Sequence, residues 1–178
     1  YTGYILKKAN LAETMENVRG MESVITAEYN FVSEATADTD DAVQVVLKEN
    51  PRSGEQWVLN SCGIQEAWKT LEKNGISAGG DSGVVVAVID TGVDYTHKDL
   101  KANMWVNSKE TSNNGSDDDG NGYVDDYYGV DITAGKGSAM DDEGHGTHVA
   151  GIIAAANNKE GVVGIAYNTK IMAIKAGD

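Results

Sequence analysis

The sequence predicts an α/β fold, in which a small α+β piece precedes an incomplete doubly wound parallel sheet. Two apolar segments, Gly83–Ile89 and Lys170–Lys175, are typical of buried strands. The first is rich in β-branched residues, and we expect it to be buried on both faces of the sheet. His145–Ala156 lies between the two and predicts a helix with small residues on its packing face. Strand, long loop, helix and strand in this order indicate an α/β domain.

Residues 3–32 predict the small α+β piece. Gly3–Lys8 and Val24–Val32 indicate extended chain, and Leu11–Val18 between them has the pattern of an amphipathic helix that Gly20 would end. A strand, a helix and a strand of this size would form a marginal core alone. We therefore expect this piece to pack against a partner surface.

The segment Glu34–Asp81 combines a linker with one helix. Asp38–Asp41 is interpreted as an acidic linker, and Asn50-Pro51 is expected to interrupt regular secondary structure. Ile64–Lys73 after it predicts a helix. The apolar residues of this helix have the three-and-four spacing of a buried face: Ile64, Ala67, Trp68 and Leu71.

Length and composition exclude several classes of protein. The 178 residues are 40% hydrophobic and 24% charged, proportions that suit a globular domain. The longest apolar stretches, 83–89 and 146–156, are shorter than the roughly 18 to 20 residues of a membrane span, so we expect no membrane insertion. The net charge of −14 opposes binding to nucleic acid. A single cysteine, Cys62, allows no intrachain disulfide.

Two residues stand where catalytic groups gather in α/β sheets, at strand carboxyl ends and helix N-termini. Asp90 ends the apolar strand, and His145 begins the predicted helix. A carboxylate beside an imidazole holds its tautomer and stabilises the imidazolium. The acidic run Asp141–Glu143, directly before His145, would further favour the protonated ring. From spacing alone, a capping Asp and a hydrogen-bonded His remain the alternative.

The segments around both residues resemble the catalytic motifs of subtilisin-like serine proteases, the subtilases. Val86-Ala-Val-Ile-Asp90-Thr-Gly-Val-Asp94, with His97–Leu100, resembles the motif of the catalytic aspartate. Gly144-His145-Gly-Thr-His-Val-Ala-Gly151 is similar to that of the catalytic histidine. The resemblance implies that Asp90 orients the ring and that His145 is the general base. It also implies a subtilisin-like fold and a secreted or cell-surface serine endopeptidase, made as a zymogen, that cleaves polypeptide substrates through an acyl-enzyme.

The resemblance extends along the chain and suggests three parts. Residues 1–36 are interpreted as the end of an inhibitory prosegment, residues 37–82 as a linker and the mature amino-terminal extension, and residues 83–178 as the first part of the catalytic domain. The prosegment would then be a partner of the protease. Lys98 and Tyr167 stand where family members often have Pro, and we interpret both as changes in surface turns.

An acidic loop separates the two motifs. Residues 117–143 hold nine of the acidic side chains and a single Lys. Oxygen-bearing side chains alternate at the start of this loop as in an EF-hand, but Tyr128 stands where that motif has Glu. The alternative is a solvated acidic turn. We expect a structural calcium site, and its predicted ligands are Asp117, Asp119, Asn121 and Asp126, with the Tyr123 carbonyl and Asp125 as further candidates.

Subtilases also need a serine nucleophile, in a Gly-Thr-Ser-Met-Ala type motif, and an oxyanion Asn. Ser82, Ser138 and Thr147 lie in no such context, so we expect these groups in a carboxy-terminal part outside the chain and no activity from residues 1–178 alone. A non-catalytic calcium-binding scaffold is the main alternative. A hydrolase with a metal on His145 and His148 is another, but no Glu lies between them as in a zincin helix. We interpret His148 as a packed or hydrogen-bonded residue.

Overall fold

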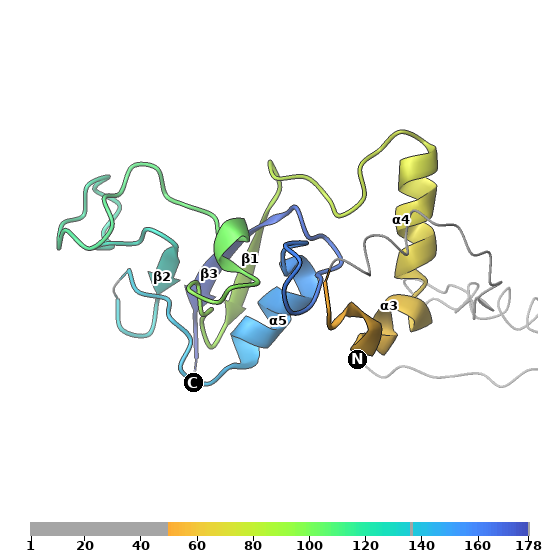
Figure 1. Ribbon diagram of the computed structural model, residues 1–178. Coiled ribbons are helices and arrows are strands. Elements are labelled where there is room, and N and C mark those ends of the chain that lie inside the picture. The colour runs from red at the N-terminus through yellow and green to blue at the C-terminus, as the bar shows by residue number, and fades with distance from the viewer. Residues whose placement is uncertain (1–49, 136, 178) are drawn as a thin grey trace, which may run out of the picture. The chain divides into compact units, whose positions relative to one another are not determined.

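The structure, a computed structural model, describes residues 50–135 and 137–177. The α+β piece predicted for residues 3–32 and the boundary predicted at residue 36 lie outside these residues. Figure 1 shows the order of the elements. They are η1 (Ser53–Glu55), α3 (Trp57–Ser61), α4 (Ile64–Lys73), β1 (Val85–Asp90), η2 (Lys101–Asn103), β2 (Gly129–Asp131), α5 (His145–Ala154) and β3 (Lys170–Lys175). The predicted α/β order of strand, loop, helix and strand is confirmed.

The sheet has three parallel strands in the order β1-β3-β2. Val88 on β1 and Gly129 on β2 both align with Ala173 on β3. Two strands were expected from the sequence, and that expectation is wrong because β2 was missed. With three residues, β2 is too short to show a hydrophobic period, and it forms because β3 offers its backbone along this edge.

One face of the sheet carries the core. Helix α5 packs against β1 and β3, and the buried residues between them include Val88, Ala150, Ala154, Ile171 and Ala173. Small alanines on α5 let its backbone approach the strands closely, as its sequence predicts.

The other face of β1 is open within the described residues. Val85 is 42% exposed and Ile89 is 65% exposed. The expectation that this strand is buried on both faces is therefore wrong for residues 50–135 and 137–177. Burial on both faces needs helices on both sides of a parallel sheet, and here α5 covers a single side.

Helix α4 follows the predicted bounds and belongs to a second apolar cluster. Trp68 is 3% exposed, and its Nε1 donates to the carbonyl of Ile165 at 3.0 Å. Tyr167 lies in a turn, as predicted, but its ring is half-buried and meets Trp68 edge-on with ring centroids 5.5 Å apart. Burial raises the pKa of the Tyr167 hydroxyl. On the same helix, Ala67 is exposed rather than buried.

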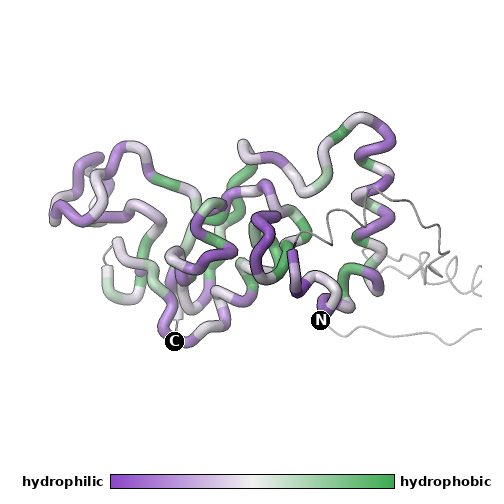
Figure 2. The backbone as a smooth tube through the Cα atoms, in the orientation of Figure 1, coloured by the Kyte–Doolittle hydropathy of each residue, from purple (hydrophilic) through white to green (hydrophobic). Residues whose placement is uncertain are grey.

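The loop between β1 and α5 differs in character from the sheet. Figure 2 shows mainly hydrophilic residues along 109–122.

None of the helices in the described part of the chain has the length and apolar character that crossing a bilayer requires.

Candidate active site

Asp90 and His145 meet at the carboxyl end of the sheet. Asp90 is the last residue of β1, and His145 is the first residue of α5. His145 Nδ1 lies 2.7 Å from Asp90 Oδ1, which also accepts a hydrogen bond from the Thr91 amide at 2.8 Å. The His145 side chain is 70% exposed and that of Asp90 is 19% exposed. Nδ1 faces the carboxylate, so Nε2 is the nitrogen that can exchange a proton with a reacting group.

Asp90 and His145 shift each other's pKa. Hydrogen bonds from His145 and from the Thr91 amide lower the pKa of Asp90. The hydrogen bond to Asp90 raises the pKa of His145, and the charges of Asp90 and Asp141 add to this effect. The expectation that acidic residues before His145 favour the imidazolium is thus confirmed for Asp141. The pair is suited to accept a proton on the imidazole while the carboxylate stays ionised.

A close approach of α5 to the end of β1 makes this geometry possible. The Gly146 amide donates to Thr91 Oγ1 at 2.9 Å. A Cβ atom at Gly146 would lie 2.1 Å from the Gly92 carbonyl oxygen, a distance that no side chain tolerates. Glycine is therefore required directly after His145.

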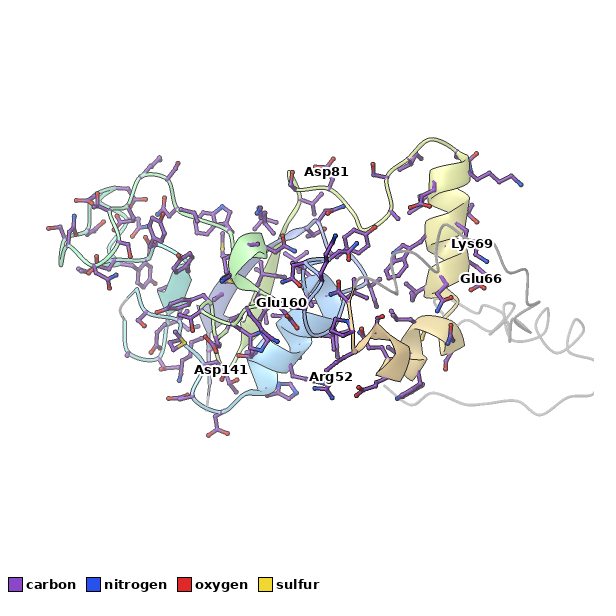
Figure 3. The ribbon with its side chains drawn as sticks, viewed as in Figure 1. Arg52, Glu66, Lys69, Asp81, Asp141 and Glu160 are labelled. Carbon is purple, nitrogen blue, oxygen red and sulfur yellow. The ribbon has the colours of Figure 1, made fainter. Side chains whose placement is uncertain are left out.

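Asp141 accepts hydrogen bonds from both elements of the site, and Figure 3 shows it beside the beginning of α5. Its carboxylate accepts from the Thr91 hydroxyl at 2.9 Å and from the amides of Gly144 and Thr147 at 2.9 Å each. Burial raises the pKa of Asp141, but the hydrogen bonds from Thr147, Gly144 and Thr91 outweigh it and hold the pKa well below its usual range. The sequence analysis assigned no hydrogen bonds to Asp141 or Thr91, because no local pattern indicates contacts across 50 positions.

His148 lies one turn beyond His145 and is exposed, so it is not packed, which was one of the two interpretations of this residue. Throughout residues 50–135 and 137–177, the one group of three or more acidic, histidine or cysteine side chains with converging ligand atoms lies elsewhere, at Glu110, Asp119 and Asp126. A metal held by His145 and His148 would have no such third ligand there.

That acidic group lies in the loop before β2. Ligand atoms of Glu110, Asp119 and Asp126 lie within 4.8 Å of one another. Asn107 Nδ2 bridges two of the carboxylates, at 3.1 Å from Asp119 Oδ2 and 2.9 Å from Asp126 Oδ1. Glu110 is 6% exposed and Asp126 is 8% exposed. Three carboxylates this close repel one another unless protons or a cation neutralise them.

The predicted calcium ligands divide between two roles. Asp119 and Asp126 belong to the acidic group, and Asn121 Nδ2 donates to Asp126 Oδ2 at 2.8 Å. Asp117 instead accepts from the amides of Gly120 and Gly122 at 2.7 and 2.9 Å, and so closes the turn. Glu110 was missed, because it lies outside the alternating motif and no spacing connects it to the loop.

One oxygen of Glu110 distinguishes the group from a solvated turn. Glu110 Oε1 accepts from the amides of Asp118 and Asp119 at 2.8 and 3.1 Å. Glu110 Oε2 is buried and has no hydrogen-bond partner. A buried, unpartnered carboxylate oxygen beside two other carboxylates fits a hard cation such as calcium.

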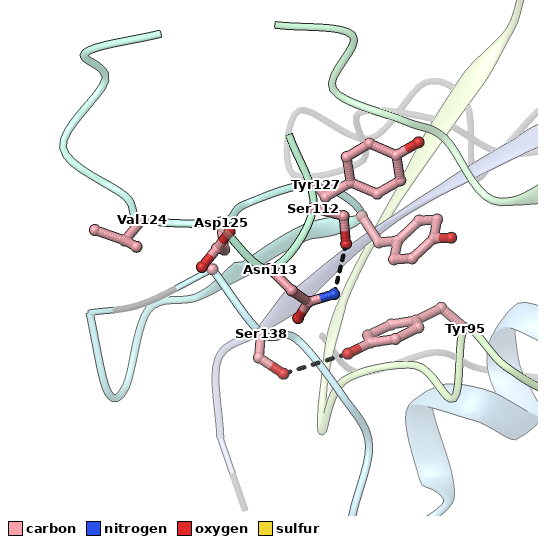
Figure 4. A pocket seen from close by; sticks show the side chains of 9 residues that line it. Tyr95, Ser112, Asn113, Val124, Asp125, Tyr127 and Ser138 are labelled. Carbon is pink, nitrogen blue, oxygen red and sulfur yellow. Dashed lines mark hydrogen bonds between the residues drawn. The ribbon is translucent and has the colours of Figure 1, made fainter. Parts of the chain in front are cut away.

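Two hollows lie near these groups, and neither is lined by Asp90 or His145. A cavity of about 650 Å³ lies along α5 and includes Thr147, His148 and Ile152 in its lining. A smaller cavity of about 310 Å³ is bordered by Tyr95, Asp125 and Ser138, with Tyr95 Oη 3.4 Å from Ser138 Oγ (Figure 4). Tyr95 stacks on Tyr128 with ring centroids 4.7 Å apart, which makes one wall of this cavity aromatic.

Comparison with known proteins identifies the family. The model of the subtilase family matches residues 81–178. Subtilisin-like protease 1 of Plasmodium falciparum is 42% identical over 125 residues, which are 69% of this chain and 17% of that protein. The thermophilic serine proteinase of Bacillus sp. strain AK1 is 33% identical over 175 residues, 98% of this chain and 34% of that protein.

An extracellular protease of Xanthomonas campestris is 32% identical over 152 residues, which are 79% of this chain and 25% of that protein. The chain therefore spans about a sixth to a third of the length of these relatives. The resemblance to the subtilases is confirmed, and the α/β sheet described above is part of a subtilisin-like fold. The chain belongs to the subtilase family of serine proteases.

Proposed function

We propose that the protein is a serine endopeptidase in which Asp90 and His145 are two members of an Asp-His-Ser triad. The observation that carries the proposal is the 2.7 Å contact between His145 Nδ1 and Asp90 Oδ1. The two residues come from different elements and are 55 positions apart, and each stands in a segment that resembles the family's motif for that role. In this arrangement the carboxylate holds the ring so that Nε2 faces the reacting groups.

The chemistry assigned to the pair is acyl transfer. His145 Nε2 takes the proton of a serine hydroxyl as its oxygen bonds to the carbonyl carbon of the scissile peptide. The imidazolium then gives this proton to the peptide nitrogen as the C–N bond breaks, which releases the amine and leaves an acyl-enzyme. Water hydrolyses the ester in the second half, with His145 again as base. Asp90 stabilises the imidazolium in both halves and stays ionised.

The serine and the oxyanion donors are assigned to a part of the protein outside this chain. In support, the chain spans 17% to 34% of the relatives compared above. Residues 1–178 alone are therefore expected to be inactive. We also assign residues 1–36 to the prosegment and residues 83–178 to the first part of the catalytic domain. The proposed substrates are polypeptides. A secreted or cell-surface location is supported by the relative named as an extracellular protease.

Labelling of the full-length protein with a serine-directed phosphonate tests the triad. His145→Ala is expected to abolish labelling, because the serine loses its base. His148→Ala is the matched control, since it removes an exposed imidazole from the same helix and should leave the labelling rate unchanged. Labelling of His145→Ala at the wild-type rate would refute the assignment. An absence of labelling in the wild-type protein, together with stoichiometric bound zinc that His148→Ala removes, would favour the metal-dependent hydrolase.

We further propose that the acidic loop binds calcium. The buried Glu110 Oε2, which has no hydrogen-bond partner, carries this proposal. Glu110, Asp119 and Asp126 would supply carboxylates, and Asn121 and Asp117 from the predicted set lie in the same loop. When bound, calcium would neutralise the carboxylates and stiffen the loop before β2.

Chelation tests the calcium site. Removal of calcium is expected to lower the Tm of the full-length protein, and Asp119→Ala should abolish this response. An unchanged response in Asp119→Ala would contradict the site. A protein that binds calcium but is not labelled by the phosphonate would be the non-catalytic scaffold instead of the protease.

A further inference from the structure

We propose that Asp141 is a positioning residue that sets the distance and orientation between Asp90 and His145. The inference rests on the proposed function, because it concerns how the proposed triad is aligned. Asp141 acts through the backbone segments on which the two catalytic groups stand.

On the strand side, Asp141 is linked to the residue after Asp90. The Thr91 hydroxyl donates to Asp141 Oδ1 at 2.9 Å and accepts from the Gly146 amide at 2.9 Å. This hydroxyl therefore joins the end of β1 both to Asp141 and to the residue after His145. Its two partners, Asp141 and Gly146, lie on either side of His145 in sequence.

On the helix side, Asp141 binds the first turn of α5. Its Oδ2 accepts from the amide of Thr147 at 2.9 Å and from the Thr147 hydroxyl at 2.5 Å. Its Oδ1 accepts from the amides of Glu143 and Gly144 at 3.0 and 2.9 Å. The Thr147 hydroxyl also accepts from the Asp94 amide at 2.9 Å, which makes a second connection to the turn after β1.

The chemistry of these contacts requires an ionised carboxylate. Every polar partner of Asp141 named above is a donor, and an ionised carboxylate offers two oxygens that only accept. The side-chain amide of an Asn at this position would place its NH₂ group, which is itself a donor, against some of these donors. The hydrogen bonds keep the carboxyl group ionised although it is partly buried, so it serves as an acceptor throughout the pH range in which His145 is neutral.

The exposure of His145 explains why its position depends on the backbone. With 70% of its side chain exposed, the imidazole is not fixed by packing among residues 50–135 and 137–177. Its place is set by Asp90 and by the first turn of α5, which Asp141 ties to the end of β1. A displacement of about 1 Å in a catalytic group can reduce a rate about 100-fold.

The test compares Asp141→Asn with Glu143→Gln in the full-length protein, using a short chromogenic peptide and the phosphonate. Both variants remove one negative charge near His145, but only Asp141 accepts the hydrogen bonds described above. We expect Asp141→Asn to lower kcat and the labelling rate about 10- to 100-fold with KM within about twofold. Glu143→Gln, at an exposed position, should keep kcat within about twofold.

A second variant covers the case in which Asp141→Asn does not fold. Thr91→Val removes the hydroxyl that joins Asp141 to the strand and conserves the volume, and it should lower kcat about 10-fold with KM unchanged. Asp141→Glu, which keeps the charge, should recover part of the rate. Wild-type kcat in folded Asp141→Asn, or in Thr91→Val where that variant is the one that folds, would overturn the inference. An absence of phosphonate labelling in the wild-type protein would instead overturn the proposed function.

Discussion

The Asp90–His145 pair and the acidic loop are held in place by different parts of the molecule. The pair joins residues 55 positions apart, and its geometry depends on a strand, a helix and the core between them. The acidic group is closed by hydrogen bonds of short range, such as those from the amides of Asp118 and Asp119 to Glu110. The sheet and α5 should therefore position the pair without the loop, whereas three close carboxylates in the loop need protons or a cation to neutralise them. Activity and calcium dependence are expected to be separable.

The largest effect should come from the carboxylate of the pair. Asp90→Asn in the full-length protein is expected to lower kcat/KM about 10³- to 10⁴-fold, because an amide no longer holds the proper tautomer or stabilises the imidazolium. The response of the Tm to calcium should remain. Steady-state kinetics and thermal unfolding of the same preparation measure both. A fall of less than about tenfold would contradict the role of Asp90.

Two glycines of α5 test whether the close approach of this helix matters. Gly146→Ala should lower the free energy of unfolding by about 1 to 3 kcal/mol and reduce kcat, since its methyl group would meet the Gly92 carbonyl at 2.1 Å. Gly151→Ala in the same helix has no atom within 4 Å of its new methyl group and should stabilise by about 0.5 to 1 kcal/mol. Denaturant titrations compare the two. Equal effects of both variants would refute the close-approach argument.

Calcium binding by the loop should depend on Glu110 and not on every acidic residue of the loop. Glu110→Gln is expected to weaken calcium binding at least tenfold and to remove most of a calcium-dependent rise in Tm, of the order of 5 °C for about 2 kcal/mol of ligand stabilisation. Asp118→Asn, an exposed carboxylate of the same loop outside the acidic group, should keep that rise. Calorimetric calcium titration checks the affinities. Indistinguishable affinities would place the ion elsewhere.

The smallest effect concerns pH. Neutral His145 is the proposed base, so kcat/KM should fall as the pH drops through its pKa. Asp90 raises this pKa, which places the acidic limb above the ordinary histidine value of 6.5. His145 is exposed, so ionic strength of about 1 M should screen the charges of Asp90 and Asp141 and move the limb a few tenths of a pH unit lower. A limb below pH 6.5, or a shift toward higher pH with salt, would contradict this account.

Sequence patterns predicted β1, α4, α5 and β3, but not α3 or the two short 3₁₀ helices η1 and η2. The bounds of α4 and β3 agree with the predicted ranges, and α5 ends two residues earlier, at Ala154. The short strand β2 was missed because three residues carry no period. The exposure of Val85 and Ile89 was also missed. A β-branched run predicts a buried strand, but it does not show whether other elements pack on one face of the sheet or on both.

The sites divide in the same way. Asp90 and His145 could be proposed from their motifs, because the chemistry of each is tied to its immediate neighbours in sequence. The loop motif indicated Asp119 and Asp126, but not their neighbour Glu110, whose buried oxygen makes the strongest argument for a cation. Likewise, nothing local connects Thr91 with Asp141, which lie 50 positions apart.

The order of amino acids alone thus indicates the family, the longer helices and strands and the proposed catalytic pair, since these depend on local spacing and on residue type. The folded chain adds the contacts between distant segments. Packing of α5 on β1 brings His145 within 2.7 Å of Asp90. Asp141 accepts hydrogen bonds from Thr91, directly after β1, and from Thr147 on α5, two donors that lie far apart in the sequence. Such contacts form because burying the apolar faces of strand and helix places their polar ends side by side, and this depends on the whole core.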